Sequence, residues 1–195
     1  MENRKESKNS NGILVVILIF SLILIPNPTL IYMNLIVENT NASTTIVAVA
    51  ERELEISDFN IGGKKYKQWY GLNGNWCAMF VSYCANECGY IDEEIMQRSA
   101  AVKYMAIWYK EREQWQAKES GYEPKPGDII FFQNGMSHVG IVISYDAERK
   151  IISTIEGNTG TSNTNPYHEG SAVKEKRYPL TYKKITGYGI PNYGF

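Results

Sequence analysis

Residues 75–81 read NWCAMFV and follow a loop rich in Gly and Asn. Asn75 is a favoured N-cap residue, so we expect a helix to begin here with Cys77 as its second residue. Unpaired backbone N–H groups and the helix dipole at this position stabilise negative charge, which favours the thiolate. The stretch therefore predicts a helix that presents a partly exposed, nucleophilic thiol at its N-terminus.

Apolar residues recur at helical spacing from Cys77 to Cys88 and predict one buried helix face. We interpret Cys84 and Cys88 as small core residues, because two positions on one rigid helix are poorly placed for a disulfide. A zinc site that combines them with His168 is an alternative, although their spacing matches no zinc pattern. We accordingly expect no metal site and no cofactor.

The composition is that of a globular domain, with 44% hydrophobic and 12% aromatic residues in a chain of 195. The formal net charge is −1, which gives no indication of nucleic-acid binding. Basic clusters at residues 64–67 and 174–177 are short, as is typical of a solvated surface. We expect a monomer without a nucleic-acid partner.

The N-terminal part of the chain differs from the rest. Three basic residues precede an apolar run at residues 13–25, which a proline-broken extension carries on to residue 37. The run is either a cleaved signal segment or a retained, kinked membrane anchor. Both alternatives place the remainder of the chain outside the cytoplasm. The expected organisation is an anchor or signal segment at residues 1–37, a linker at 38–53 and a folded domain at 54–195.

Residues 51–75 are loop-like, because glycines interrupt them repeatedly. The aromatic residues of this segment either line a cleft beside Cys77 or simply cover the core helix. The candidate substrate-binding residues are Tyr66, Trp69, Tyr70, Asn75 and Trp76.

The second half of the chain changes in character from helix to strand. Ser99 is expected to cap a helix whose apolar positions run from Val102 to Tyr109. The strands that follow are expected at residues 129–132, 138–145, 151–156, 174–178 and 185–188. Helices followed by strands predict an α+β fold, in which helices pack on one side of an antiparallel sheet.

His138 opens one of these strands and Glu156 closes the next. If the two strands form a hairpin, the start of the first lies beside the end of the second, so the two residues become neighbours. A base oriented by a carboxylate is what a catalytic thiol requires. The other histidine, His168, lies in a polar loop, and we expect it to be exposed to solvent.

Four motifs in the chain resemble those of CHAP domains, the cysteine, histidine-dependent amidohydrolases/peptidases related to NlpC/P60 and papain-like hydrolases. They are WCAMFV at 76–81, PGDIIFF at 126–132, HVGIV at 138–142 and IEGN at 155–158. The resemblance implies a papain-like α+β fold and cleavage of amide bonds in bacterial peptidoglycan. It also implies that Cys77 is the nucleophile, His138 the general base and Glu156 the orienting carboxylate, with Asn158 at a polar position near them.

Three functions remain open at this point. The first is a peptidoglycan hydrolase, either an N-acetylmuramoyl-L-alanine amidase or a crossbridge endopeptidase, held at the membrane by the N-terminal segment or secreted. The second is a wall-binding module of the same fold without catalysis, and the third is a Cys-His acyltransferase. For catalysis, the backbone N–H of Cys77 is one expected oxyanion donor, and Tyr66, Tyr70 or Asn75 is the second.

Overall fold

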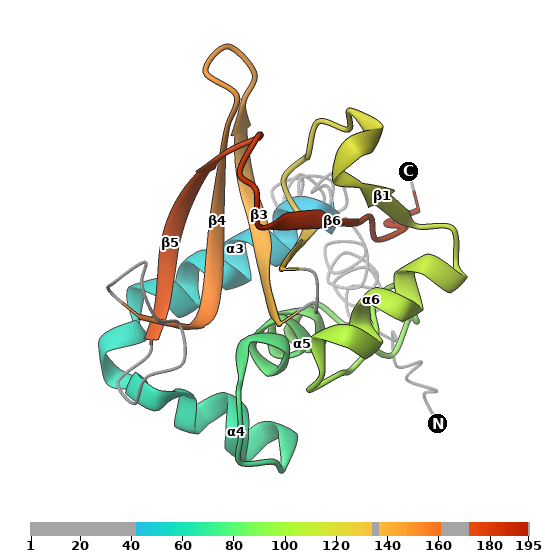
Figure 1. Ribbon diagram of the computed structural model, residues 1–195. Helices are drawn as coiled ribbons and strands as arrows, with labels where there is room; N and C mark the ends of the chain where they lie inside the picture. Colours follow the sequence, from blue (N-terminus) through green and yellow to red (C-terminus); the bar gives the residue numbers. More distant parts are fainter. Residues whose placement is uncertain (1–41, 134–136, 161–171, 195) are drawn as a thin grey trace, which may run out of the picture. The chain divides into compact units, whose positions relative to one another are not determined.

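The computed structural model describes residues 42–133, 137–160 and 172–194 (Figure 1). The expected anchor segment, the first part of the linker and His168 lie outside these residues. The described helices are α3 (Ala42–Glu55), α4 (Lys64–Tyr70), α5 (Cys77–Glu87) and α6 (Val102–Glu111), with short 3-10 turns η1 (Ser57–Phe59), η2 (Ile61–Gly63) and η3 (Lys118–Ser120). Within the described ranges, no helix is both long and apolar enough to cross a membrane.

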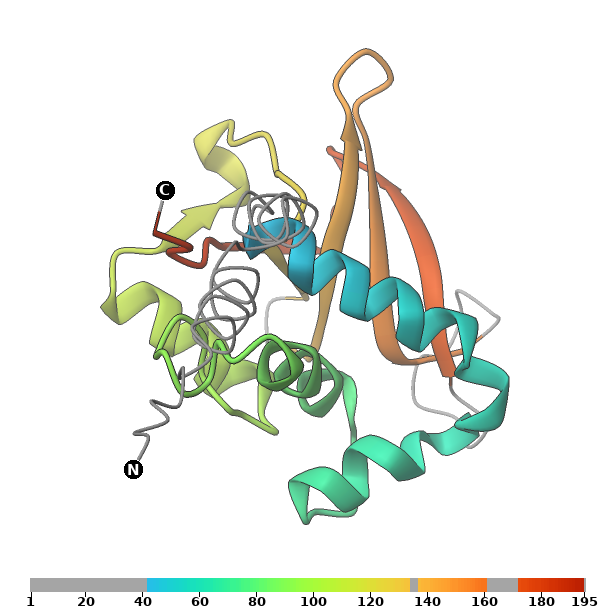
Figure 2. The ribbon, with the colours of Figure 1, turned by 180° about the vertical axis from the view of Figure 1, so that it is seen from behind.

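In the described residues, six antiparallel strands form a single sheet in the order β1-β6-β2-β3-β4-β5. They are β1 (Trp115–Ala117), β2 (Ile129–Phe132), β3 (His138–Asp146), β4 (Ile151–Thr159), β5 (Ala172–Pro179) and β6 (Ile185–Gly189). Helices α3 and α5 pack against one face of the sheet, and Figure 2 shows α3 lying across the strands from that side. The predicted α+β architecture is confirmed.

All five predicted strands are present, and β2 has the predicted bounds. The sixth strand, β1, was not predicted, because three residues are too few to show an alternating pattern. It is held at the sheet edge by pairing with β6, where Gln116 lies opposite Tyr188.

The main core lies between the sheet and α5. Every residue of α5 from Cys77 to Ala85 is buried, since α3 and α4 cover the sides of the helix that β3 and β4 leave open. The expected single apolar stripe is therefore wrong, and the helix is enclosed on all sides. Cys84 is buried as predicted, whereas Cys88 is only half-buried, and all three cysteines are free thiols.

Helix α3 corrects the interpretation of residues 38–53 as a linker. Ile46, Val49 and Ala50 belong to the core cluster, so the described part of that segment is built into the folded unit. The polar residues at the start of α3 look like a stalk in sequence. Burial against the sheet overrides that local composition.

Residues 51–75 are also not the loop that their glycines predict. They contain the end of α3, two 3-10 turns and α4. A partly buried ion pair joins α3 to α4: Lys65 Nζ lies 2.7 Å from both carboxylate oxygens of Glu53. Tyr66 Oη donates to the same carboxylate at 3.0 Å. These contacts between distant residues fix the segment.

Packing, rather than a side-chain cap, sets the start of α5. The N-cap residue is Trp76, which makes no side-chain cap hydrogen bond, and Cys77 is the first helical residue. The expected Asn75 cap is therefore wrong by one position. Trp76 is 1% exposed and stacks on Tyr66, with ring centroids 5.2 Å apart.

The expected cap of the next helix also differs from the structure. Helix α6 begins at Val102, and its N-cap residue is Ala101 rather than Ser99. Ser99 instead exchanges hydrogen bonds of 2.9 Å with the buried Ser82 side chain of α5. The serine therefore ties the loop before α6 to α5.

Candidate active site

His138 and Glu156 lie side by side on β3 and β4. The antiparallel pairing places Ile141 opposite Ile155, which brings the start of β3 to the end of β4. His138 Nε2 lies 2.8 Å from Glu156 Oε2, and the two residues are only 7% and 1% exposed. The contact predicted from strand direction is confirmed.

Cys77 reaches this pair from the N-terminus of α5. Its side chain lies close enough to the His138 imidazole to help raise the pKa of that ring. The expectation of a partly exposed thiol is wrong, since Cys77 is 3% exposed. The first hydrogen bond of the helix runs from Phe80 N–H to the Trp76 carbonyl, so the N–H of Cys77 has no partner within the helix.

The surroundings of His138 shift the pKa of its imidazole strongly. Burial alone would lower its pKa, because a buried cation loses its hydration. The hydrogen bonds and negative charges of Cys77 and Glu156 outweigh that effect and raise the pKa of His138 to about 10. The arrangement therefore favours the imidazolium form of His138 near neutral pH.

Two residues that the sequence did not single out hold Glu156 in place. Thr154 Oγ1 donates to Glu156 Oε1 at 2.6 Å, and Tyr178 Oη donates to Glu156 Oε2 at 3.3 Å. Gly140 leaves the space for this carboxylate, because a Cβ there would lie 2.6 Å from Glu156 Cγ. The alternation of β4 could have indicated Thr154, which lies two residues before Glu156 on the same face. Tyr178 depends on the register of β5, which the sequence does not reveal.

Asn158 connects the end of β4 to the loop before Cys77. It is 6% exposed and adopts a positive φ of 57° where the β4–β5 register shifts. Its Nδ2 donates to Asn75 Oδ1 at 3.5 Å. The preceding Gly157 lets the end of β4 approach α5 closely, because a Cβ at Gly157 would lie 2.5 Å from Phe80 Cβ.

Comparison with known families agrees with this arrangement. Residues 69–158 match the family model of the CHAP domain. This region of the chain is therefore similar to a CHAP domain. The matched region begins in α4, ends in β4 and includes all four candidate catalytic residues, namely Cys77, His138, Glu156 and Asn158. No curated protein and no solved structure matches the chain.

A CHAP domain implies peptidoglycan as the substrate and an amidase or peptidase that hydrolyses its amide bonds. The α+β architecture agrees with the papain-like fold of this family. The match ends before β5. Tyr178, which contacts Glu156, therefore lies on a strand outside the matched CHAP region.

The candidate substrate-binding residues have different environments in the structure. Tyr66 and Trp76 are 0% and 1% exposed, so they pack in the core and are closed to a substrate. Trp69 and Tyr70 are half-buried beneath the guanidinium of Arg98, which lies 5.0 and 4.1 Å from their ring centroids. Tyr66 and Trp76 thus cover the core helix, the second of the two roles considered for these aromatic residues, whereas Trp69 and Tyr70 remain partly accessible.

A surface cavity of about 480 Å³ lies beside α4 instead. None of the aromatic candidates lines it; its lining residues are Gly62, Lys64, Lys67, Gln68, Gly71, Leu72 and Asn73. Asn75 is exposed, and its side chain accepts a hydrogen bond from Asn158.

The part of the chain that the structure describes contains no candidate metal site. No group of three or more His, Cys, Asp or Glu residues there could hold a metal ion. His168, which the zinc alternative requires, lies outside the described residues.

Proposed function

We propose that this chain is a peptidoglycan hydrolase with a thiol mechanism, in which Cys77 is the nucleophile, His138 the acid and base, and Glu156 the orienting carboxylate. The observation that carries the proposal is the buried 2.8 Å contact between His138 and Glu156, with the Cys77 side chain near the same ring. A nucleophile, a base and a group that orients the base are the parts that covalent acyl transfer requires.

The reaction follows from these three groups. The Cys77 thiolate attacks the amide carbonyl, and the C–N bond breaks as the His138 imidazolium gives its proton to the leaving amine. A thioester remains on Cys77. Neutral His138 then takes a proton from water, which attacks the thioester and releases a carboxylic acid. The thiolate and the imidazolium are restored.

The oxyanion of each tetrahedral intermediate needs hydrogen-bond donors. The backbone N–H of Cys77, which has no partner within α5, supplies the first. Asn75 is our candidate for the second, because its side chain is exposed two residues before Cys77 and its Oδ1 already accepts from Asn158. Tyr66 is a poor candidate, since it is buried and donates its hydroxyl to Glu53.

We further propose that the enzyme acts outside the cytoplasm, tethered by its N-terminal segment or secreted after cleavage. The support for this location is the apolar run at residues 13–25 with basic residues before it. Peptidoglycan lies on that side of the membrane.

Digestion of purified peptidoglycan tests the proposed function. The full-length chain in detergent is compared with Cys77→Ala, and Cys88→Ser serves as a control because Cys88 is half-buried at the far end of the same helix. We expect soluble fragments from the wild type and the control but none from Cys77→Ala. Release of the same fragments by Cys77→Ala would refute the proposal.

Mass spectrometry of the products identifies the bond. New carboxyl and amino termini within the peptide indicate an endopeptidase, whereas a lactoyl group freed from the peptide indicates an amidase. New amide bonds in place of new carboxylates would instead indicate acyl transfer, which uses the same Cys77 and His138. Sedimentation of an inactive wild type with the wall would favour the binding module.

A further inference from the structure

The sheet face opposite the helices carries both Glu156 and two lysines of β5. Lys174 pairs with Glu156 across β4 and β5, and Lys176 pairs with Thr154. Residues opposite each other in a sheet share a face. Ile155, between Thr154 and Glu156 on β4, and Val173, directly before Lys174 on β5, alternate with them in direction and belong to the core that the helices cover. The lysines therefore share the face on which Glu156 contacts His138.

Aromatic rings extend this face from His138 to the turn between β5 and β6. Phe132 lies beside His138, with ring centroids 5.8 Å apart, and Tyr178 follows at 5.0 Å from Phe132. Tyr182, in the turn, stacks on Tyr178 at 5.0 Å with an interplanar angle of 24°. The turn thus lies over the same face of the sheet.

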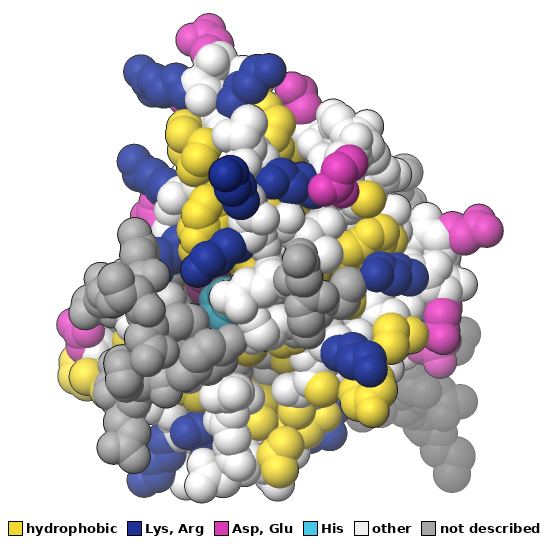
Figure 3. Space-filling model, in the orientation of Figure 1, with side chains coloured by type: hydrophobic (Ala, Val, Ile, Leu, Met, Phe, Trp, Pro, Cys, Tyr) yellow, Lys and Arg dark blue, Asp and Glu magenta, His cyan; other side chains and the backbone are white. Residues whose placement is uncertain are grey.

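The turn brings further ammonium groups to this face. Lys118 Nζ donates to the Tyr182 carbonyl at 2.9 Å, and the exposed Lys183 and Lys184 follow directly in sequence. Figure 3 shows Lys and Arg side chains gathered over β4, β5 and this turn. We define the basic face by its five lysines: Lys118, Lys174, Lys176, Lys183 and Lys184.

The positive charge of the basic face is local, because the chain as a whole carries −1. Glu156 lies on the face but is 1% exposed and accepts hydrogen bonds from within the protein. The bordering carboxylate Glu175 pairs with Arg177 at 3.1 Å. Lys176 Nζ donates to the Gly160 carbonyl at 3.0 Å, a neutral acceptor that leaves its charge uncompensated.

We propose that the basic face binds free carboxylates of the peptidoglycan stem peptide and so positions the peptide for cleavage at Cys77. The inference rests on the proposed function. Lys174 lies two strands from β3, about 10 Å from the His138 strand at the usual strand spacing. An extended peptide covers roughly 3.5 Å per residue. A carboxylate about three residues from the scissile bond would therefore reach Lys174.

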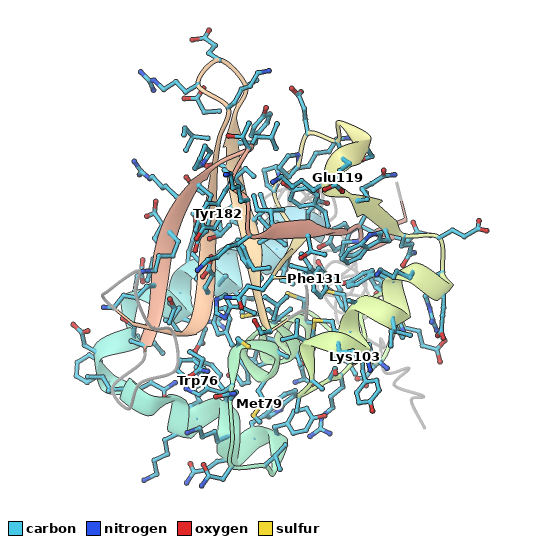
Figure 4. All side chains as sticks on the ribbon, in the orientation of Figure 1. Trp76, Met79, Lys103, Glu119, Phe131 and Tyr182 are labelled. Carbon is cyan, nitrogen blue, oxygen red and sulfur yellow. The ribbon has the colours of Figure 1, made fainter. Side chains whose placement is uncertain are left out.

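The test uses the full-length chain with Lys174→Gln, Lys184→Gln and the double variant. Lys176 is left unchanged because its contact with Gly160 supports the end of β4. Lys103→Gln is the matched control, since Lys103 is exposed on α6, away from Tyr182 and the basic face (Figure 4). The substrates are soluble glycan-peptide fragments of peptidoglycan with free carboxylates, and the same fragments after conversion of the carboxylates to methylamides.

We expect each single variant to raise KM for the free-carboxylate fragments roughly two- to fivefold, as for an exposed ion pair, without a change in kcat. The double variant should raise KM by about the product of the two, since distant sites add. With methylamide fragments, the variants and the wild type should have the same KM. An unchanged KM, or equal increases on both substrates, would overturn the proposal.

A second measurement separates this inference from the proposed function. Cosedimentation of Cys77→Ala with intact peptidoglycan measures binding without cleavage. Adding Lys174→Gln and Lys184→Gln to this variant should weaken binding to peptidoglycan with free carboxylates but not to peptidoglycan whose carboxylates are converted to methylamides. A wild type that cleaves neither substrate refutes the proposed function, yet the binding comparison still decides the carboxylate contact. Lysine variants that lose binding to phosphatidylglycerol vesicles but keep the wild-type KM would assign the face to lipid and overturn the proposal.

Discussion

Both oxygens of the Glu156 carboxylate accept hydrogen bonds, which gives this residue a fixed orientation towards His138. Oε1 accepts from Thr154, and Oε2 accepts from Tyr178 and lies 2.8 Å from His138 Nε2. The carboxylate is 1% exposed, so water does not compete for these positions. The orientation of the imidazole thus depends on side chains from two strands, β4 and β5.

The raised pKa of His138 predicts the alkaline limit of activity. A raised pKa means that the imidazolium, the acid that protonates the leaving amine, persists up to about pH 10 and is lost as the pH rises further. Activity should therefore fall with an apparent pKa near 10. Glu156→Gln removes a negative charge that stabilises the imidazolium, so its alkaline limb should move to lower pH. We also expect kcat/KM to drop by about 10²-fold.

The pH–rate profiles of wild type and Glu156→Gln check this expectation. Glu175→Gln is the matched control, because Glu175 is an exposed carboxylate on the next strand whose partner is Arg177. An alkaline limb at the same pH in wild type and Glu156→Gln would contradict the assigned role of Glu156.

Tyr178→Phe tests the positioning of Glu156 with little disturbance of packing. The ring keeps its contacts with Phe132 and Tyr182, and only the hydroxyl that donates to Glu156 is lost. We expect kcat to fall by about three- to tenfold, the equivalent of about 1 kcal/mol, with little change in KM. Steady-state kinetics on soluble fragments measure this, and Tyr104→Phe, at an exposed position of α6, is the control. A change in KM alone would point to substrate binding by Tyr178.

Thr154→Val should affect stability as well as activity. Thr154 is fully buried, and its replacement leaves Glu156 Oε1 without its 2.6 Å donor. An unsatisfied buried acceptor costs about 1–3 kcal/mol, so the free energy of unfolding should fall by that amount. Urea unfolding measures the loss, with the exposed Thr181→Val as control. Equal stabilities would show that the hydrogen bond contributes nothing to the fold.

At the scale of elements, α3 is the least expected part of the architecture. Its apolar side packs on β3, β4 and β5, and its Glu53 is buried against Lys65 and Tyr66 of α4. Helix α4 in turn supports Trp76 through the stacked ring of Tyr66. The start of α5, and with it the position of Cys77, thus depends indirectly on α3.

Ile46→Ala should therefore destabilise the whole domain. Ile46 is 0% exposed in the core, and truncation of a buried isoleucine costs about 2–5 kcal/mol through lost burial and the cavity that remains. Glu51→Ala, on the exposed side of the same helix, should change the free energy of unfolding by less than about 0.5 kcal/mol. Chemical unfolding of both variants tests this, and a stability loss shared equally by the two would mean that α3 contributes only helix propensity.

At the scale of the whole molecule, residues 41–195 form one compact unit that includes α3 and the sheet. A fragment of residues 41–195 should keep the unfolding transition and the activity of the full-length chain. A fragment of residues 56–195 lacks α3, exposes the apolar surface that α3 covers, and should be unfolded or aggregated. Circular dichroism and digestion of peptidoglycan compare them, and an active shorter fragment would show that α3 is dispensable.

The sequence by itself determined the α+β order, the five principal strands and the contact between His138 and Glu156. These features are local: alternating residues define a strand, and a hairpin register brings together positions only 18 residues apart. The motifs around Cys77 and His138 likewise indicated the CHAP domain that the family comparison supports at residues 69–158.

Only the tertiary structure decided the remaining features of the site. Burial of Cys77, the start of α5 at a packed Trp76, and the placement of Tyr178 on Glu156 arise from contacts between distant segments. The same is true of α3, whose polar start gives no local sign that its other side is buried. Such features depend on which surfaces meet in the folded chain, and burial then overrides local propensity because it contributes more free energy.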